Sequence, residues 1–229
     1  NEKGNYNWLP RGTTIAYFPE PKDKGMLQHM IMKCRADELC PEADAILHVD
    51  ADVMFWEGFS PSDYLPHDKP LLLRETYAQA AAHNHHLLGW RETVVNATGI
   101  EPVFETMIRH PQVHLRQVYA RLREIVPQHT GHEFDEYVLS GRNVFPQSFC
   151  EFNALGAVAI QEFASRYTMQ DYDRAKDAQE CPDAPPGFQY LYRNGRDKCI
   201  ETWSHHGIAH YQALFDKIMR GERPAYVVK

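Results

Sequence analysis

Short apolar runs alternate with longer amphipathic segments along the chain, which is the pattern of an α/β protein. Thr13–Phe18 and Ala45–Val49 are such runs and predict strands, the second of the kind found in buried parallel sheets. Between them, apolar residues at helical spacing predict a helix over Met26–Leu39, which ends before Pro41. Strand followed by helix and strand again predicts a largely parallel sheet.

The pattern continues into the second half of the chain. Ser60 before Pro61 predicts the start of a helix, and Pro70–Arg74 predicts another strand. Further helices are expected over 76–98, His110–Val126, Ala154–Arg166 and His210–Met219, and short strands at Leu191–Tyr192 and Cys199–Trp203. Residues 171–187 are acidic and rich in proline, which predicts a loop. We therefore expect one α/β domain over residues 1–229, with helices flanking the sheet and a more irregular C-terminal portion.

Composition narrows the function only slightly. The 229 residues are 43% hydrophobic and 24% charged, as in ordinary globular proteins. The formal net charge of −7 argues against general binding to nucleic-acid backbones, although Arg116, Arg121 and Arg123 offer a local basic group. The five cysteines form no C-x-x-C pair, so reduced thiols and a cytoplasmic location are expected. We expect neither a membrane span nor a signal peptide.

Asp50 and Asp52 follow directly after the apolar run AILHV. Side chains alternate along an extended chain, so the two carboxylates project to the same side and would repel each other. A divalent ion such as Mg²⁺ or Mn²⁺ resolves that repulsion and keeps positions open for diphosphate oxygens. An isolated D-x-D is more often a surface turn. Here an apolar stretch, Val53–Trp56, follows the acids, which favours the metal site.

The segment ILHVDADVMF, followed by FSPSDYL, resembles the D-x-D region of glycosyltransferases with the GT-A fold. EPVFETMIRHP, FDEYVLS, FCEFNALGA and TWSHHG resemble stretches of bacterial and phage proteins of the same kind, and the resemblance covers roughly residues 13–210. It implies a Rossmann-like sheet and transfer of a sugar from a nucleotide-diphosphate sugar. Thr13–Phe18 matches a second or third strand of that fold, so the strand that binds the nucleotide base is expected to be missing from residues 1–229.

The resemblance also implies roles for individual residues. Asp52 would bind the metal directly, Asp50 would be shared between metal and donor, and His205, with His206 as second choice, would be the third ligand. Glu151 would be the base that deprotonates the acceptor hydroxyl in an inverting reaction, although an acid at a helix start is also common for electrostatic reasons alone. Asp135 and its neighbour Glu136 are the reserve candidates for the base.

Contacts to donor and acceptor are less specific. Trp90 offers a face on which a sugar ring can stack, and Glu105, Arg109 and His110 are further candidates for the same cleft, although each is more often a packed or solvated side chain. A UDP-sugar is favoured as donor, and the acceptor would be a glycan, a small molecule or a modified base. His83, His85 and His86 are interpreted as a solvated helix face, because His-x-His-His spreads its rings around a helix axis.

Two other functions stay open. A haloacid-dehalogenase-type phosphohydrolase also places D-x-D at a strand end, but the chain lacks the small residues that usually follow the second Asp and has no clear match for the later motifs. A non-catalytic module that binds nucleotide sugars or glycans is the other alternative.

Overall fold

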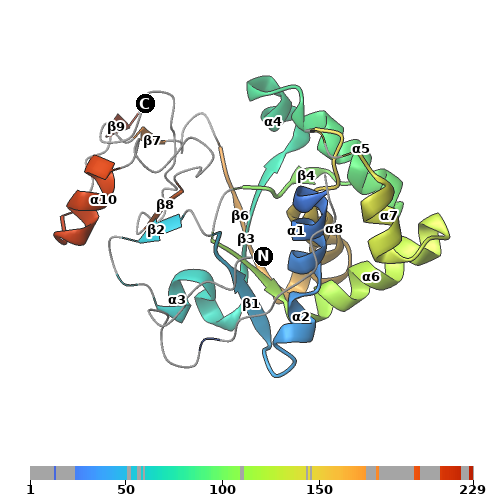
Figure 1. The fold of residues 1–229 in the computed structure, drawn as a ribbon, viewed down its shortest axis with the longest axis horizontal. Helices are drawn as coiled ribbons and strands as arrows, with labels where there is room; N and C mark the ends of the chain where they lie inside the picture. The colour runs from blue at the N-terminus through green and yellow to red at the C-terminus, as the bar shows by residue number, and fades with distance from the viewer. Residues whose placement is uncertain are drawn as a thin grey trace.

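The computed structural model describes residues 13, 24–50, 53–55, 58, 60–108, 111–142, 144, 146–173, 179–180, 199–201, 212–222 and 227–228. These residues form an α/β structure. Most of the helices gather on one side of the molecule, strands run through the middle, and α10 lies with several short strands on the other side (Figure 1). No helix among the described residues combines the length and apolar character needed to cross a bilayer. The predicted α/β class is confirmed.

The described helices and strands are these. The helices are α1 Gly25–Cys34, α2 Ala36–Leu39, α3 Pro61–Tyr64, α4 Tyr77–His83, α5 Leu87–Thr98, α6 Arg116–Thr130, α7 Phe134–Ser140, α8 Glu151–Phe163 and α10 Gln212–Met219, with 3₁₀ turns η1 Pro66–Asp68 and η2 Ala164–Arg166. The strands are β1 Ala45–His48, β2 Val53–Phe55, β3 Leu71–Thr76, β4 Phe104–Glu105, β5 Gln112–Leu115, β6 Thr168–Asp171, β7 Gln179–Glu180, β8 Cys199–Glu201 and β9 Val227–Val228.

The expectation of a mostly parallel sheet is wrong for the described residues. β1 pairs antiparallel with β5, β2 with β8 and β7 with β9, while the remaining sheet has the order β4-β3-β6. Only β3 and β6 are parallel among the described pairs. A short apolar run such as that of β1 fits either direction of pairing, so the sequence pattern carries no information on the partner strand.

Several predicted helices differ from the observed ones, and the segment 76–98, for example, holds the two helices α4 and α5. The helix expected over Met26–Leu39 is divided into α1 and α2 at Arg35, whose φ of −114° and ψ of 14° leave the helical region. The helix expected from His110 begins only at Arg116, because Gln112–Leu115 form strand β5, which is buried on both faces. Gln112–Leu115 alternate polar and apolar side chains, but four residues are a short run, and they lead directly into the amphipathic pattern of α6.

The core lies between the helices and the strands. α6 and α8 pack against each other, and α1, α5 and α7 pack around them. The largest fully buried side chains include Tyr119 and Leu122 of α6 and Phe152 and Leu155 of α8. Every residue of α8 from Glu151 to Ala159 is buried, so this helix forms the centre of the helical layer. Its first residue, Glu151, is buried as well.

Candidate functional site around Lys33

Lys33 joins two of the residues that the sequence singles out. Its Nζ lies 2.9 Å from Oδ1 of Asp50 and 3.1 Å from Oε1 of Glu151. The side chains of Lys33, Asp50 and Glu151 are 10%, 23% and 4% exposed, so the group is buried at Glu151 and opens toward solvent at Asp50. One ammonium thus holds both carboxylates, and we call these three residues the Lys33 cluster.

Three separate elements supply the cluster. Lys33 is in the last turn of α1, Asp50 follows the end of β1, and Glu151 is the first residue of α8. α1 packs directly against α8, which brings Lys33 to Glu151. The carbonyl of Asp50 accepts a hydrogen bond of 3.1 Å from the amide of Val53. The carboxylates are therefore fixed by elements far apart in sequence.

The electrostatics of Lys33 follow from this placement. Burial alone would lower the pKa of its ammonium, but the adjacent carboxylates of Glu151 and Asp50 outweigh that effect and raise the pKa above its ordinary value. Lys33 thus stays charged at neutral pH. Its Nζ also lies 4.8 Å from the centre of the Phe152 ring, which adds a cation–π contact.

Aromatic side chains form the inner wall of the cluster. His48 of β1 lies edge-on to Phe152 at 5.3 Å between ring centres. One ring nitrogen of His48, Nε2, is 2.6 Å from the hydroxyl of Tyr119, and this hydrogen bond joins β1 to α6. The strand that leads to Asp50 is thereby fixed against two core helices.

The start of α8 is also tied to the segment after β4. Oδ1 of Asn153 accepts hydrogen bonds from the amides of Thr106 and Met107, at 2.7 and 3.0 Å. The Thr106 hydroxyl donates to the carbonyl of Phe152 at 3.0 Å. Gly156 permits this approach, since a Cβ there would lie 2.0 Å from Oγ1 of Thr106. The stretches FCEFNALGA and EPVFETMIRHP, both singled out by the sequence, are thus in direct contact.

Several predicted ligands lie outside the described residues: Asp52, Arg109, His110, His205 and His206. The backbone around two of them is nevertheless informative. β2 begins at Val53, directly after Asp52, and β8 ends at Glu201, four positions before His205. Val53 and Glu201 are partners in the antiparallel register of these strands. The described strands that flank the D-x-D and TWSHHG segments are therefore paired.

The reserve base Asp135 has a different environment. It lies on α7 and accepts a hydrogen bond of 3.0 Å from Nε of Arg35, and its side chain is 43% exposed. Its neighbour Glu136 is 66% exposed and 3.8 Å from a ring nitrogen of His132. Trp90 is half-buried on α5, where its carbonyl accepts a hydrogen bond from Thr93. Compared with Glu151, Asp135 is an exposed partner in a surface ion pair.

Other residues of the sequence hypotheses have structural partners. Arg121 forms two hydrogen bonds with Glu162, and Arg123 forms two with Asp37. The local basic group suggested for nucleic acid is therefore largely neutralised by paired acids. Glu105 is fully buried, opposite Glu75 in the β3–β4 register, rather than lining an open cleft.

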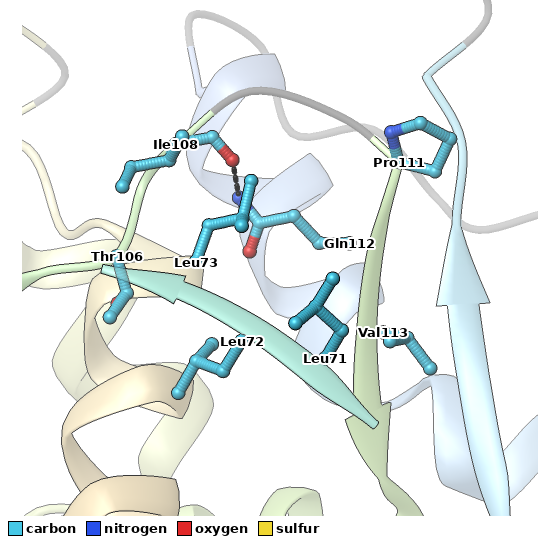
Figure 2. Close-up of a pocket in the computed structure, with 8 residues that line it drawn as sticks. All are labelled: Leu71, Leu72, Leu73, Thr106, Ile108, Pro111, Gln112 and Val113. Atoms are coloured by element: carbon cyan, nitrogen blue, oxygen red, sulfur yellow. Dashed lines mark hydrogen bonds between the residues drawn. The ribbon is translucent and has the colours of Figure 1, made fainter. Parts of the chain in front are cut away.

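A cavity lies between β3 and β5 (Figure 2). Its lining is mainly apolar and consists of Leu71, Leu72, Leu73, Thr106, Ile108, Pro111, Gln112 and Val113. Nε2 of Gln112 donates a hydrogen bond of 2.8 Å to the carbonyl of Ile108, as the dashed line shows (Figure 2). None of the residues that the sequence proposes for metal or catalysis lines this cavity, so it does not mark the donor site.

Lys33 and His48 are the two members of this region that sequence reasoning missed. Lys33 sits on a helix face in a segment without any motif, so only its partners identify it. His48 lies within the quoted stretch ILHVDADVMF, where a polar ring inside an apolar strand was an available signal. Cys34, Cys40 and Cys150 are free thiols, and burial raises the pKa of Cys34 and Cys150 well above the ordinary value.

In comparisons with known proteins, no family model, no curated protein and no solved structure matches this chain.

Proposed function

We propose that this chain is a metal-dependent glycosyltransferase domain of GT-A-like organisation, which moves a sugar from a nucleotide-diphosphate sugar to an acceptor hydroxyl. The observation that carries the proposal is the Lys33 cluster. The D-x-D acid Asp50 and the proposed base Glu151 are 101 positions apart in the sequence, yet they contact the same ammonium nitrogen. A transferase of this class needs its donor-binding acid and its base in one site, and the shared contact with Lys33 supports that assignment.

The two carboxylate oxygens of Glu151 differ in their hydrogen bonding. Oε1 contacts Lys33, whereas Oε2 has no hydrogen-bond partner among the described residues. In the proposed reaction the acceptor hydroxyl donates a hydrogen bond to Oε2. It transfers its proton to Oε2 as its oxygen attacks the anomeric carbon of the donor sugar. The bond from that carbon to the diphosphate oxygen breaks, and its electron pair leaves with the nucleoside diphosphate. The contact between Lys33 and Oε1 fixes the direction of the Glu151 carboxylate before the acceptor arrives.

The chemistry of Asp50 fits a divalent ion. Its side chain is 23% exposed, which allows an ion and a diphosphate to approach, while the contact to Lys33 fixes its direction. Asp50, Asp52 and His205 would hold the ion, with Asp52 as the direct ligand. A bound Mn²⁺ or Mg²⁺ would neutralise the charge that develops on the diphosphate. A UDP-sugar is the favoured donor, and a glycan, a small molecule or a modified base would be the acceptor.

The first test is binding. Thermal unfolding of the full chain is followed with UDP-, GDP- and other nucleotide sugars, each with and without Mn²⁺. A ligand that binds only the folded state raises the melting temperature, so one nucleotide class is expected to give a rise that requires Mn²⁺. Asp50→Asn is expected to remove that rise. If no nucleotide sugar shifts the wild-type transition at any metal concentration, the proposed function is wrong.

The second test separates binding from catalysis. Glu151→Gln is expected to retain the metal-dependent donor shift and to lower hydrolysis or transfer of the donor by about 10²–10⁴-fold, since it removes the base. Glu162→Gln is the matched control, because it makes the same change on the same helix at an ion pair with Arg121. The control should leave turnover unchanged.

The competing functions have their own outcomes in these experiments. A binding module would show the donor shift with neither hydrolysis nor transfer in the wild-type chain. A phosphohydrolase would release inorganic phosphate from simple phosphoesters and would lose that activity in Asp50→Asn, because Asp50 would be its nucleophile.

A further inference from the structure

A second group of ligand-type side chains shares no residue with the Lys33 cluster. Glu75, His83 and Asp173 each offer one atom able to bind a metal, and the three atoms lie within 4.8 Å of one another. Ligands around a single divalent ion are separated by similar distances, because each lies about 2.0–2.3 Å from the ion. Small adjustments of the side chains would therefore allow all three to share one ion.

The fold brings these residues together from three places in the sequence. Glu75 lies near the end of β3, and Asp173 follows the end of β6, the parallel partner of β3. The amide of Tyr172 donates a hydrogen bond of 2.8 Å to the carbonyl of Arg74, which continues the contact between the two chains past the end of β6. The carboxyl ends of parallel strands are a common place for ligand sites in α/β proteins.

Helix α4 supplies the third residue. It starts directly after β3, where the Thr76 hydroxyl accepts a hydrogen bond of 3.2 Å from the amide of Gln79 and caps the helix. His83 is the last residue of α4 and is exposed. The sequence pattern had grouped His83 with His85 and His86, but the structure separates them. The rings of His85 and His86 lie 4.0 Å apart, against each other, and only His83 reaches Glu75 and Asp173.

Glu105 places a further acidic side chain beside the group. Glu75 and Glu105 are only 1% and 0% exposed, and they are direct partners across β3 and β4. Facing partners in an antiparallel pair have their Cβ atoms about 5 Å apart. The two carboxyl groups therefore lie on the same face of the sheet. Asp173, half-buried, adds a third carboxylate to the same region.

We propose that Glu75, His83 and Asp173 form a binding site for a divalent transition-metal ion, separate from the metal proposed at Asp50. One imidazole with two carboxylates suits Mn²⁺, Fe²⁺ or Zn²⁺ better than Mg²⁺ or Ca²⁺, which prefer oxygen ligands alone. Because His83 is exposed, water completes the coordination on the solvent side. The ion links the end of β3, the end of α4 and the chain after β6, so its main effect is to stabilise this region.

The test uses the full chain in an Asp50→Asn background, which weakens binding of the metal proposed at the donor site. After chelation, Mn²⁺ or Zn²⁺ alone is titrated and the melting temperature and binding heat are measured. The ion is expected to raise the melting temperature of Asp50→Asn. Adding His83→Ala or Asp173→Asn should weaken binding about ten-fold or more and remove the rise.

His85→Ala is the matched control, since it deletes a nearby exposed histidine that is not part of the group. It should leave the metal-induced rise intact. Glu75→Gln is a third variant, but its burial makes His83→Ala the decisive one, because removal of an exposed imidazole leaves folding unaffected. The proposal is overturned if Asp50→Asn shows no metal response, or if His83→Ala and His85→Ala respond alike. Neither result bears on nucleotide-sugar binding by the wild-type chain.

Discussion

Lys33 is the residue on which the candidate site depends, and nothing around it in the sequence marks it. Asp50 and Glu151 were identifiable from local motifs, since one follows an apolar strand and the other starts an apolar helix. Their common partner is identifiable only from contacts. Lysine side chains are usually exposed, so a lysine that is 10% exposed and lies between two carboxylates is unusual. This placement indicates a fixed electrostatic role.

We predict that Lys33→Met destabilises the protein by about 3–5 kcal/mol, because it leaves the buried Glu151 carboxylate without its cation. The double variant Lys33→Met with Glu151→Gln should recover a large part of that loss. Urea unfolding at pH 7 measures both. Lys69→Met is the control, since Lys69 is exposed and its ammonium donates a hydrogen bond to the carbonyl of Ser165. Equal stability of Lys33→Met and Lys69→Met would contradict the ion-pair role of Lys33.

At the scale of elements, α8 connects the site to the core. It starts with Glu151, packs against α1 and α6, and holds the segment after β4 through Asn153. The sequence predicted a helix in this region but started it at Ala154, three residues late. No side chain caps the helix start at Cys150, so the usual sequence signal for a first turn is absent.

Substitution of Gly156 tests the packing of α8 against Thr106. Alanine normally stabilises a helix interior by about 1 kcal/mol relative to glycine. Here the added Cβ would lie 2.0 Å from Oγ1 and 2.6 Å from Cβ of Thr106, so Gly156→Ala should destabilise the protein by roughly 1–3 kcal/mol. Chemical denaturation gives the value. Gly58→Ala, where a Cβ meets nothing within 4 Å, should change little. A stabilised Gly156→Ala would mean that Thr106 does not contact α8 in solution.

The whole molecule should lose stability at alkaline pH. Burial raises the pKa of Tyr77, Tyr119 and Tyr167 above the ordinary value, and the pKa of Lys33 is raised by its carboxylates against the effect of burial. A group whose pKa is higher in the folded state contributes stability that is complete below its unfolded pKa and is lost as the pH rises toward the folded one. The loss therefore begins near pH 10, where free tyrosine and lysine titrate.

Urea midpoints between pH 7 and pH 11 measure this loss, and ultraviolet absorbance of tyrosinate reports which rings ionise. Tyr119→Phe should reduce the pH dependence above pH 10, since it removes one of the buried hydroxyls. A midpoint that stays constant from pH 9 to pH 11 would be inconsistent with buried neutral tyrosines.

The sequence by itself determined the α/β class, the strand before Asp50, the helix start at Ser60 and the position of most later helices. These features depend on local periodicity and capping, which a single segment carries within itself. The direction of strand pairing was not determined in this way. Ala45–His48 and Gln112–Leu115 are short runs that fit several partners, and only the structure shows that they pair antiparallel.

Only the tertiary structure decided which chemical groups meet. It joined Asp50 to Glu151 through Lys33, selected His83 from three neighbouring histidines and placed it with Glu75 and Asp173, and buried Glu75 opposite Glu105. Each of these contacts joins segments far apart in sequence. The physical reason is that charge, burial and ligand geometry are properties of the space between elements, and the local pattern of a single segment does not specify that space.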